Sequence, residues 1–245
     1  MRIEVILLPR ELRPENLSER AVVVFDVLRA TTSMATALAA GVKEIRVFGD
    51  LDSALAAARA FSGPHLTCGE RHAIKPPGFD LGNSPGSFQR DFHADTTLFM
   101  TTTNGTVAIL AAMNAQALFV GALINAGRVA VALVQTGLDV TLLCSGTEGY
   151  VSTEDTLGAG AVIAALESRT SVELASDTAW MARDLFRSRR ESLYDALYES
   201  RGGHNIRRAG LEPDIAACSA LDALDAVGIV RRGDPPAVTL WRERA

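Results

Sequence analysis

The chain has 245 residues, of which 48% are hydrophobic and 22% are charged. This much apolar material can build a sizeable core and excludes an intrinsically disordered chain. The formal net charge of −5 argues against a nucleic-acid partner, while a small anionic ligand can still be bound by a local group of arginines.

The cysteines and the N-terminus both favour a cytoplasmic protein. Cys68, Cys144 and Cys218 are too few and too scattered for a disulfide framework, and none belongs to a CxxC metal motif. The apolar run in "MRIEVILLPR" is shorter than the core of a signal peptide or a membrane span. We therefore expect neither a membrane partner nor export.

Up to Val172 the sequence alternates between strand-like and helix-like segments. The β-branched run "AVVVFD" is typical of a strand that is covered on both faces. Helix-like segments follow these strands, with Gly41 as one stop and Asp50 as one cap. The predicted strands are 3–8, 21–26, 44–49, 65–70, 96–102, 117–123 and 139–146, and the predicted helices are 33–41, 51–61, 104–114, 125–137 and 154–168.

After Val172 we expect helices over 177–200 and 212–228, then a last strand over 237–243. The alternation indicates an α/β fold with a largely parallel sheet sandwiched by helices, a three-layer α/β/α arrangement. We expect one domain over residues 1–245, and if two intimate halves exist they divide near 125–175.

Polar side chains follow the strand that ends at residue 26. In "DVLRATTS", Asp26 closes an apolar run, and a buried aspartate needs a metal, an arginine or backbone donors. Arg29, Thr31 and Thr32 then lie at a predicted helix start, where phosphate binds well. The alternative is that Thr32 or Ser33 caps the helix and Arg29 lies at the surface.

The segment 69–88 is long for a loop in a compact protein, and such loops are usually functional or disordered. Glu70 and Asp80 are candidates for metal ligands or acid/base groups. Arg71 and Lys75 can meet an anionic substrate, whereas a lone loop histidine such as His72 is more often simply exposed.

Two further strand ends carry hydroxyls and glycines. The run "TTTNGT" resembles an anion-binding turn, although it equally fits a turn with a helix cap, and it lacks the ending of a Walker loop. In "CSGTEGYVSTED", Glu154 and Asp155 either favour the next helix dipole or complete a cation site. Cys144 is better explained as a buried core residue.

Taken together, "VVVFDVLRATTS", "GFDLGNSP", "TTTNGT" and "SGTEGYVSTEDTLGAG" resemble the 2-phosphosulfolactate phosphatase family. The later stretch "GLEPDIAACSALDALDAV" is similar to the C-terminal segment of that family, so the likeness spans roughly residues 3 to 230. The resemblance implies a Mg²⁺-dependent phosphatase that converts (2R)-O-phospho-3-sulfolactate to 3-sulfolactate, a step of coenzyme M biosynthesis. The stretch "RHAIKPP" departs from the family pattern, which leaves the substrate identity open.

The resemblance also places individual residues in the active site, and their separate roles are our own inference. We expect Asp26, Arg29 and Glu70 to be catalytic and Asp26, Glu70 and Asp80 to bind the metal. The residues expected to bind substrate or phosphate are Thr31, Thr32, Asn83, Ser84, Thr102, Thr103, Asn104 and Gly105.

The attacking group stays open between water and a carboxylate. Asp26 lacks the DxD spacing of aspartyl-phosphate enzymes, since position 28 is Leu, so we favour water activated by the metal. Other readings are a phosphatase for a different phosphorylated carboxylic acid and a non-catalytic sensor of a sulfonated or phosphorylated acid. The amphipathic segments 177–200 and 212–228 favour a homodimer.

Overall fold

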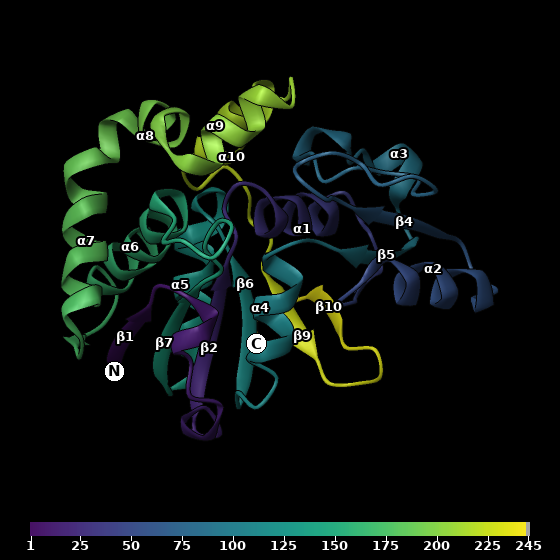
Figure 1. Cartoon of the computed structure of the whole chain (residues 1–245). Coiled ribbons are helices and arrows are strands. Elements are labelled where there is room, and N and C mark those ends of the chain that lie inside the picture. The colour runs from purple at the N-terminus through teal and green to yellow at the C-terminus, as the bar shows by residue number, and fades with distance from the viewer. Residues whose placement is uncertain (244–245) are drawn as a thin grey trace.

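The structure is a computed structural model that describes residues 1–243, and its centre is one ten-stranded sheet (Figure 1). The strand order is β4-β5-β3-β10-β9-β6-β2-β7-β1-β8. The strands are β1 Arg2–Ile6, β2 Arg20–Phe25, β3 Glu44–Val47, β4 His65–Gly69, β5 Thr97–Thr101, β6 Ala117–Gly121, β7 Asp139–Cys144, β8 Glu173–Leu174, β9 Gly228–Arg231 and β10 Ala237–Leu240.

The sheet consists of two parallel blocks joined by an antiparallel hairpin. One block contains β4, β5 and β3, and the other contains β6, β2, β7, β1 and β8. The hairpin of β9 and β10 lies between them and pairs antiparallel with β6 and β3. The prediction of a largely parallel sheet in a three-layer α/β/α fold is confirmed, with this hairpin as the addition.

Helices cover both faces of the sheet (Figure 1). The α-helices are α1 Ala30–Ala39, α2 Leu51–Ala60, α3 Arg90–His93, α4 Gly105–Ala111, α5 Ala126–Thr136, α6 Thr153–Glu167, α7 Asp177–Arg189, α8 Leu193–Glu199, α9 Arg201–Arg208 and α10 Pro213–Ser219. Short 3₁₀ turns are η1 Pro9–Glu11, η2 Pro14–Asn16, η3 Pro85–Ser87, η4 Leu123–Asn125 and η5 Arg190–Ser192. None of the helices within residues 1–243 has the length and apolarity needed to cross a membrane.

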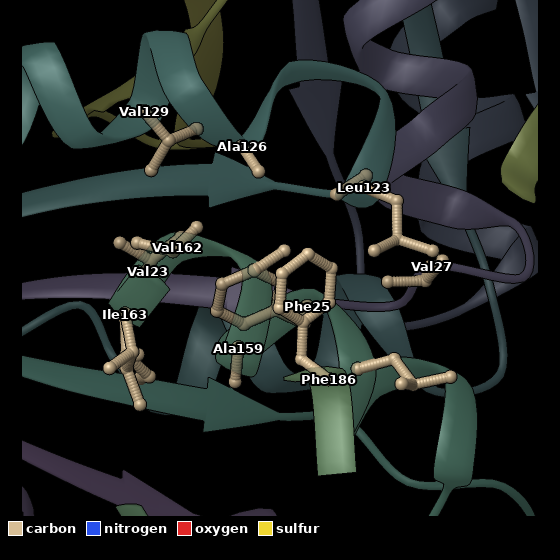
Figure 2. Packing of buried hydrophobic residues seen from close by; sticks show 14 of the residues in the cluster. Val23, Phe25, Val27, Leu123, Ala126, Val129, Ala159, Val162, Ile163 and Phe186 are labelled. Carbon is tan, nitrogen blue, oxygen red and sulfur yellow. The ribbon is translucent and has the colours of Figure 1, made fainter. Parts of the chain in front are cut away.

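The alternation of side chains along β2 explains the three layers. Val23 and Phe25 point to the face covered by α5, α6 and α7, where they belong to a cluster with Val162 and Phe186 (Figure 2). Their neighbours Val22 and Val24 belong to the cluster on the opposite face, with residues of α1 and α4. A strand that is apolar on both faces is therefore buried on both faces.

The C-terminal third differs most from the prediction. The expected helix 212–228 is wrong beyond Ser219, because α10 ends there and Gly228 already belongs to β9. The N–H groups of Asp222 and Leu224 donate hydrogen bonds to the carbonyls of Leu123 and Ile124, which ties the intervening segment to η4. Tertiary pairing of the backbone thus outweighs the helix-like spacing of the alanines and leucines.

Two other expectations for this region also need correction. No strand was predicted between Val172 and residue 237, yet β8 and β9 lie there. The predicted helix 177–200 is divided into α7, η5 and α8, and α9 follows as a separate helix. The homodimer that was inferred from this segment stays a prediction.

Helix α1 begins three residues earlier than predicted. Its first residue is Ala30, so Thr31, Thr32 and Ser33 lie in the first turn rather than before it. The side chain of the N-cap residue Arg29 does not cap the helix. The carboxylate of Asp26 accepts the hydrogen bond from the Ala30 N–H at 3.1 Å instead. The expected cap by Thr32 or Ser33 is therefore wrong.

We predict that Gly160→Ala destabilises the fold. A Cβ at this position of α6 would collide with the carbonyl oxygen of Ala182 in α7. Overpacking should outweigh the roughly 1 kcal/mol gained in helix propensity, for a net loss of about 2 kcal/mol in the free energy of unfolding. Urea denaturation measures this loss. Gly86→Ala is the control, because a Cβ at Gly86 meets nothing within 4 Å. Equal stability of the two variants would contradict the close packing of α6 on α7.

Candidate active site

A cavity of about 340 Å³ lies beyond the carboxyl ends of the parallel strands. Ligands bind at this edge in open α/β sheets. Figure 1 shows α9 and α10 above the same edge, near the start of α1. The lining residues are Asp26, Leu28, Arg29, Glu70, His72, Ala73, Ile74, Asn83, Thr103, Asn104, Thr147, Glu148, Gly202, Asn205, Ile206, Arg208 and Ala209.

Asp26 is held at the end of β2 by backbone groups. Its carboxylate accepts from the Ala30 N–H, and its own main-chain N–H donates to Thr31 Oγ1 at 3.1 Å. Gly105 lies against it so closely that a Cβ there would come within 2.8 Å of Asp26 Oδ2. Glycine is thus required at Gly105 by its close contacts with Asp26 and Ala30.

The electrostatic setting of Asp26 is unusual for a carboxyl group. Burial raises its pKa from the ordinary 3.8 to about 6, although a hydrogen bond from Ala30 lowers it. The neighbouring carboxylates Glu70 and Glu154 raise the pKa further. A cation placed among these groups would offset both the cost of burying the charged carboxylate and the repulsion between the carboxylates.

Glu70 follows β4 and faces the same cavity. Its Oε1 accepts from the Thr103 N–H at 2.6 Å, and its Oε2 accepts from the Ala73 N–H at 2.9 Å. Each carboxylate oxygen has two lone pairs, so both can still take a further partner. Glu70 thereby fixes the loops after β4 and β5 and keeps acceptor capacity toward the cavity.

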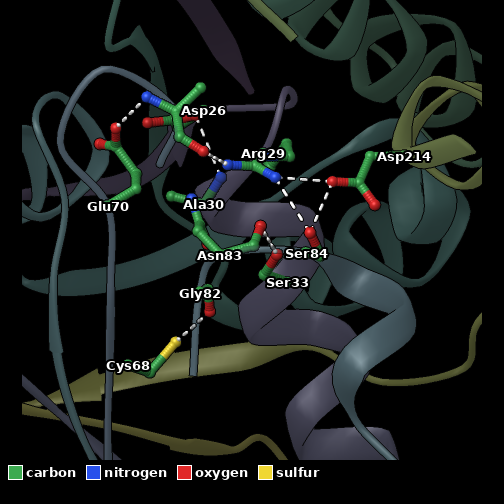
Figure 3. Close-up of polar contacts among 11 residues, drawn as sticks. Asp26, Arg29, Ala30, Ser33, Cys68, Glu70, Gly82, Asn83, Ser84 and Asp214 are labelled. Atoms are coloured by element: carbon green, nitrogen blue, oxygen red, sulfur yellow. Dashed lines mark hydrogen bonds and ion pairs between the residues drawn. The ribbon is translucent and has the colours of Figure 1, made fainter. Parts of the chain in front are cut away.

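Arg29 forms a buried ion pair with Asp214 of α10 (Figure 3). Its Nη1 lies 2.6 Å from Asp214 Oδ2 and also donates to Ser84 Oγ at 3.0 Å. Nη2 donates to the Ala73 carbonyl at 2.7 Å, and Ser84 Oγ donates to Asp214 at 2.8 Å. Arg29 therefore lines the cavity as predicted but is neutralised by a residue that the sequence reading did not single out.

Three of the predicted phosphate-binding hydroxyls face the protein interior. Thr31 Oγ1 accepts from the main chain of Asp26, and Thr32 Oγ1 donates to the Val27 carbonyl at 2.7 Å. Thr102 Oγ1 accepts from the Thr106 N–H at 3.1 Å. All three side chains are buried and absent from the cavity lining among the described residues. In the structure these hydroxyls fasten the starts of α1 and α4.

The remaining predicted phosphate-binding residues divide into two groups. Asn83, Thr103 and Asn104 line the cavity together with Asp26. Ser84 lies beside the cavity in the Arg29–Asp214 network, and Gly105 packs on Asp26.

Asp80 lies apart from the other predicted metal ligands. It is exposed, and its Oδ2 accepts hydrogen bonds from Thr67 N at 2.8 Å and from Thr67 Oγ1 at 2.7 Å. It is not among the described residues that line the cavity. The structure thus separates Asp80 from Asp26 and Glu70, because its carboxylate fastens the 69–88 loop to β4.

The acidic pair at the start of α6 lies directly behind Asp26. Asp155 accepts from the N–H groups of Val27 at 2.8 Å and Gly146 at 3.0 Å. Burial raises its pKa well above the usual value, and the charges of Asp26 and Glu154 add to this. Asp155 therefore connects the loops after β2 and β7 and does more than interact with a helix dipole.

The site contains oxygen acceptors that suit a hard cation. Asn83 Oδ1 and Glu154 Oε2 are buried and have no hydrogen-bond partner among the described residues. Within residues 1–243 no three His, Cys, Asp or Glu side chains form a preassembled metal cluster. Mg²⁺ is compatible with this arrangement, since it commonly uses one or two carboxylates together with substrate phosphate oxygens and water.

The wall of the cavity opposite the strand ends comes from α9, which the sequence reading did not single out. Gly202, Asn205, Ile206 and Arg208 of this helix line the cavity. Gly202 adjoins Glu154, because a Cβ there would collide with Glu154 Oε1. The "RGGHNIRR" run has two glycines and little apolar periodicity, so it gave no helix signal.

Comparison with known proteins identifies the family. A family model described as 2-phosphosulpholactate phosphatase matches residues 6–233. The chain belongs to this family. Its similarity to a probable 2-phosphosulfolactate phosphatase of Carboxydothermus hydrogenoformans is 40% identity over 227 residues, which cover 93% of this chain and 92% of that protein. Proteins of the same printed name from Cyanothece sp. and Clostridium novyi are 36% and 34% identical, and the matches cover 94% and 93% of this chain and 96% of each relative. Family membership confirms the prediction of an enzyme of the phosphatase type.

We predict that Asp26 makes the metal-free protein less stable as pH rises. Because the folded state holds the Asp26 proton up to about pH 6, whereas the ordinary pKa is 3.8, stability falls as pH increases between these values. One pKa unit corresponds to about 1.4 kcal/mol, so the loss is about 3 kcal/mol. In EDTA, the stability of Asp26→Asn relative to the natural protein should rise by about this amount from pH 4 to pH 7, as measured by urea unfolding. A pH-independent difference would contradict the raised pKa.

We also predict that Asp214→Asn destabilises the protein by about 3 kcal/mol, because it leaves a buried guanidinium without its counter-charge. The side chains of Arg29 and Asp214 are only 2% and 11% exposed. Glu173→Gln is the control, since the Arg2–Glu173 pair is 59% and 65% exposed and such pairs contribute about 1 kcal/mol or less. If both substitutions lower the free energy of unfolding equally, the buried pair contributes no more to stability than the exposed one, and the prediction is wrong.

Proposed function

We propose that this protein is a magnesium-dependent phosphatase that hydrolyses the phosphate ester of (2R)-O-phospho-3-sulfolactate to 3-sulfolactate and phosphate. The observation that carries the proposal is the pair of cavity carboxylates Asp26 and Glu70, whose mutual repulsion helps to raise the Asp26 pKa. Family membership supports the reaction class, and the printed names of the relatives support the substrate.

Asp26 and Glu70 would hold the Mg²⁺, and Asn83, whose Oδ1 is buried without a partner among the described residues, also lines this cavity and could supply a further oxygen. When bound, Mg²⁺ supplies Lewis-acid stabilisation of the charge on the phosphate oxygens. Its positive charge also removes the reason for an acidic cavity to repel an anionic substrate.

The chain itself supplies donors and orientation. Thr103 and Asn104 line the cavity beside Asp26, where their side chains can donate to phosphate oxygens. Arg29 also lines it and is held rigidly by Asp214, Ser84 and the Ala73 carbonyl. A fixed guanidinium can stabilise charge in the transition state without reorganisation. Catalysis would then come mainly from positioning and charge stabilisation.

Water is the attacking group in this proposal. The Asp26 carboxylate is engaged by the Ala30 N–H and packed against Gly105, which restricts its approach to a phosphorus atom. Attack by Asp26 would form an acyl phosphate on the protein, and hydroxylamine would convert it to a hydroxamate. Mass spectrometry of protein quenched during turnover should show no such adduct at Asp26.

The central test is phosphate release from phosphorylated hydroxy acids, with Mg²⁺ or with EDTA. We expect release from 2-phosphosulfolactate with Mg²⁺ only, and a fall in kcat of about 100-fold or more in Asp26→Asn. Asp80→Asn is the matched control, since Asp80 is bonded to Thr67 outside the cavity, and it should retain activity within a few-fold.

Each alternative outcome has a distinct meaning. Preferential release from another phosphorylated acid would keep the reaction and replace the substrate. Activity that is unchanged by EDTA would remove the metal from the proposal. No release from any member of the panel would contradict the function and favour a binding protein.

A further inference from the structure

The substrate proposed above carries two negative groups besides its phosphate, a carboxylate and a sulfonate. The lining of the cavity includes the carboxylates of Asp26, Glu70 and Glu148. Mg²⁺ at Asp26 and Glu70 would compensate the phosphate, but the other anionic end needs a positive partner of its own.

Only two guanidinium groups belong to the described lining of this cavity, and one of them is already neutralised. Arg29 is paired with Asp214 at 2.6 Å. Arg208, the last residue of α9, is exposed, and its side chain makes no hydrogen bond or ion pair within residues 1–243. Apart from these two arginines, His72 is the lining side chain that can become positive.

The other arginines of α9 are engaged elsewhere, which distinguishes Arg208 from a general basic helix end. Arg201 stacks over the Tyr150 ring at 4.3 Å and lies 3.9 Å from Glu148. Arg207 stacks over Tyr198 at 3.9 Å and bonds to His204 at 2.7 Å. Neither of these two is part of the cavity lining.

From this arrangement we infer that Arg208 binds the anionic group of the substrate remote from the phosphate, and that it is a specificity-determining residue. The inference rests on the proposed function for its substrate. A guanidinium offers a planar fork of donors that matches carboxylate or sulfonate oxygens, and hydrogen bonds between charged groups are the strong ones. Arg208 lines the cavity from the end of α9, whereas Asp26 and Glu70 line it from the ends of β2 and β4. In this proposal the acidic groups meet the metal and phosphate, and the guanidinium meets the other end of the ligand.

The test compares Arg208→Gln with the natural protein on three substrates with Mg²⁺. For 2-phosphosulfolactate we expect kcat/KM to fall about 10-fold to 100-fold, mainly through KM, as a lost charge-assisted bond would produce. For p-nitrophenyl phosphate, which has no second acidic group, the change should stay within about 3-fold. Arg208→Lys should restore part of the loss, because it keeps the charge without the fork.

The third substrate, 2-phospholactate, distinguishes the two anionic groups. It has the carboxylate and lacks the sulfonate. If Arg208 binds the carboxylate, the loss appears with this substrate too; if it binds the sulfonate, the loss is confined to 2-phosphosulfolactate. Arg59→Gln on the exposed face of α2 is the matched control and should leave all three rates unchanged.

A similar fall for all three substrates, or no fall for any, would overturn the inference. If the natural protein releases phosphate from none of them, the proposed function fails, and calorimetric titration with 3-sulfolactate then tests Arg208 separately. Binding that is at least 10-fold weaker in Arg208→Gln supports the inference in that case, following the same charged-bond estimate of about 10-fold or more. Equal binding, or no binding to the natural protein, overturns it.

Discussion

The carboxyl groups around the end of β2 are held close together although their charges repel. Burial and the charges of Glu70 and Glu154 raise the pKa of Asp26. Burial and the charges of Asp26 and Glu154 raise the pKa of Asp155. Backbone N–H groups hold these side chains in place, from Ala30 for Asp26 and from Val27 and Gly146 for Asp155. Asp155 thus holds the loops after β2 and β7, and Asp26, which the proposed reaction needs, holds the start of α1. A protein that concentrates negative charge in this way gives up stability at neutral pH and gains an environment that favours a divalent cation.

The sequence was most informative where one strand determines its own surroundings. The run from Val22 to Phe25 is apolar on both faces, so a buried strand and a polar residue at its end were predictable, and Asp26 and Glu70 do meet at one cavity. The inward hydrogen bonds of the Thr31 and Thr32 hydroxyls were not predictable, because they depend on Asp26 bonding to Ala30 four residues later and on where the helix then begins. The hydrogen bonds of Asp80 could not be predicted from the sequence either, because its partner Thr67 lies 13 residues earlier in the chain.

Residues from distant parts of the chain were beyond this kind of reasoning. Asp214 pairs with Arg29 across 185 positions, and nothing in "EPDIAACS" announces that partner. The α9 wall is similar, since its role depends on where the chain places the helix and not on its own pattern. The burial of Asp214, just after Pro213 at the start of α10, is seen only in the structure.

The position of the β9–β10 hairpin has a consequence for the order in which the molecule assembles. These two strands come after all the other strands of the described sheet in chain order, yet they occupy its middle, between β3 and β6. The two parallel blocks can form earlier, but the edges of β3 and β6 that face each other stay unpaired until residues 228–240 arrive. Unpaired strand edges invite pairing with other chains, and contacts of long sequence range form slowly. The growing chain is therefore exposed to aggregation until residues 228–240 have been made, and the pairing of that segment closes the sheet.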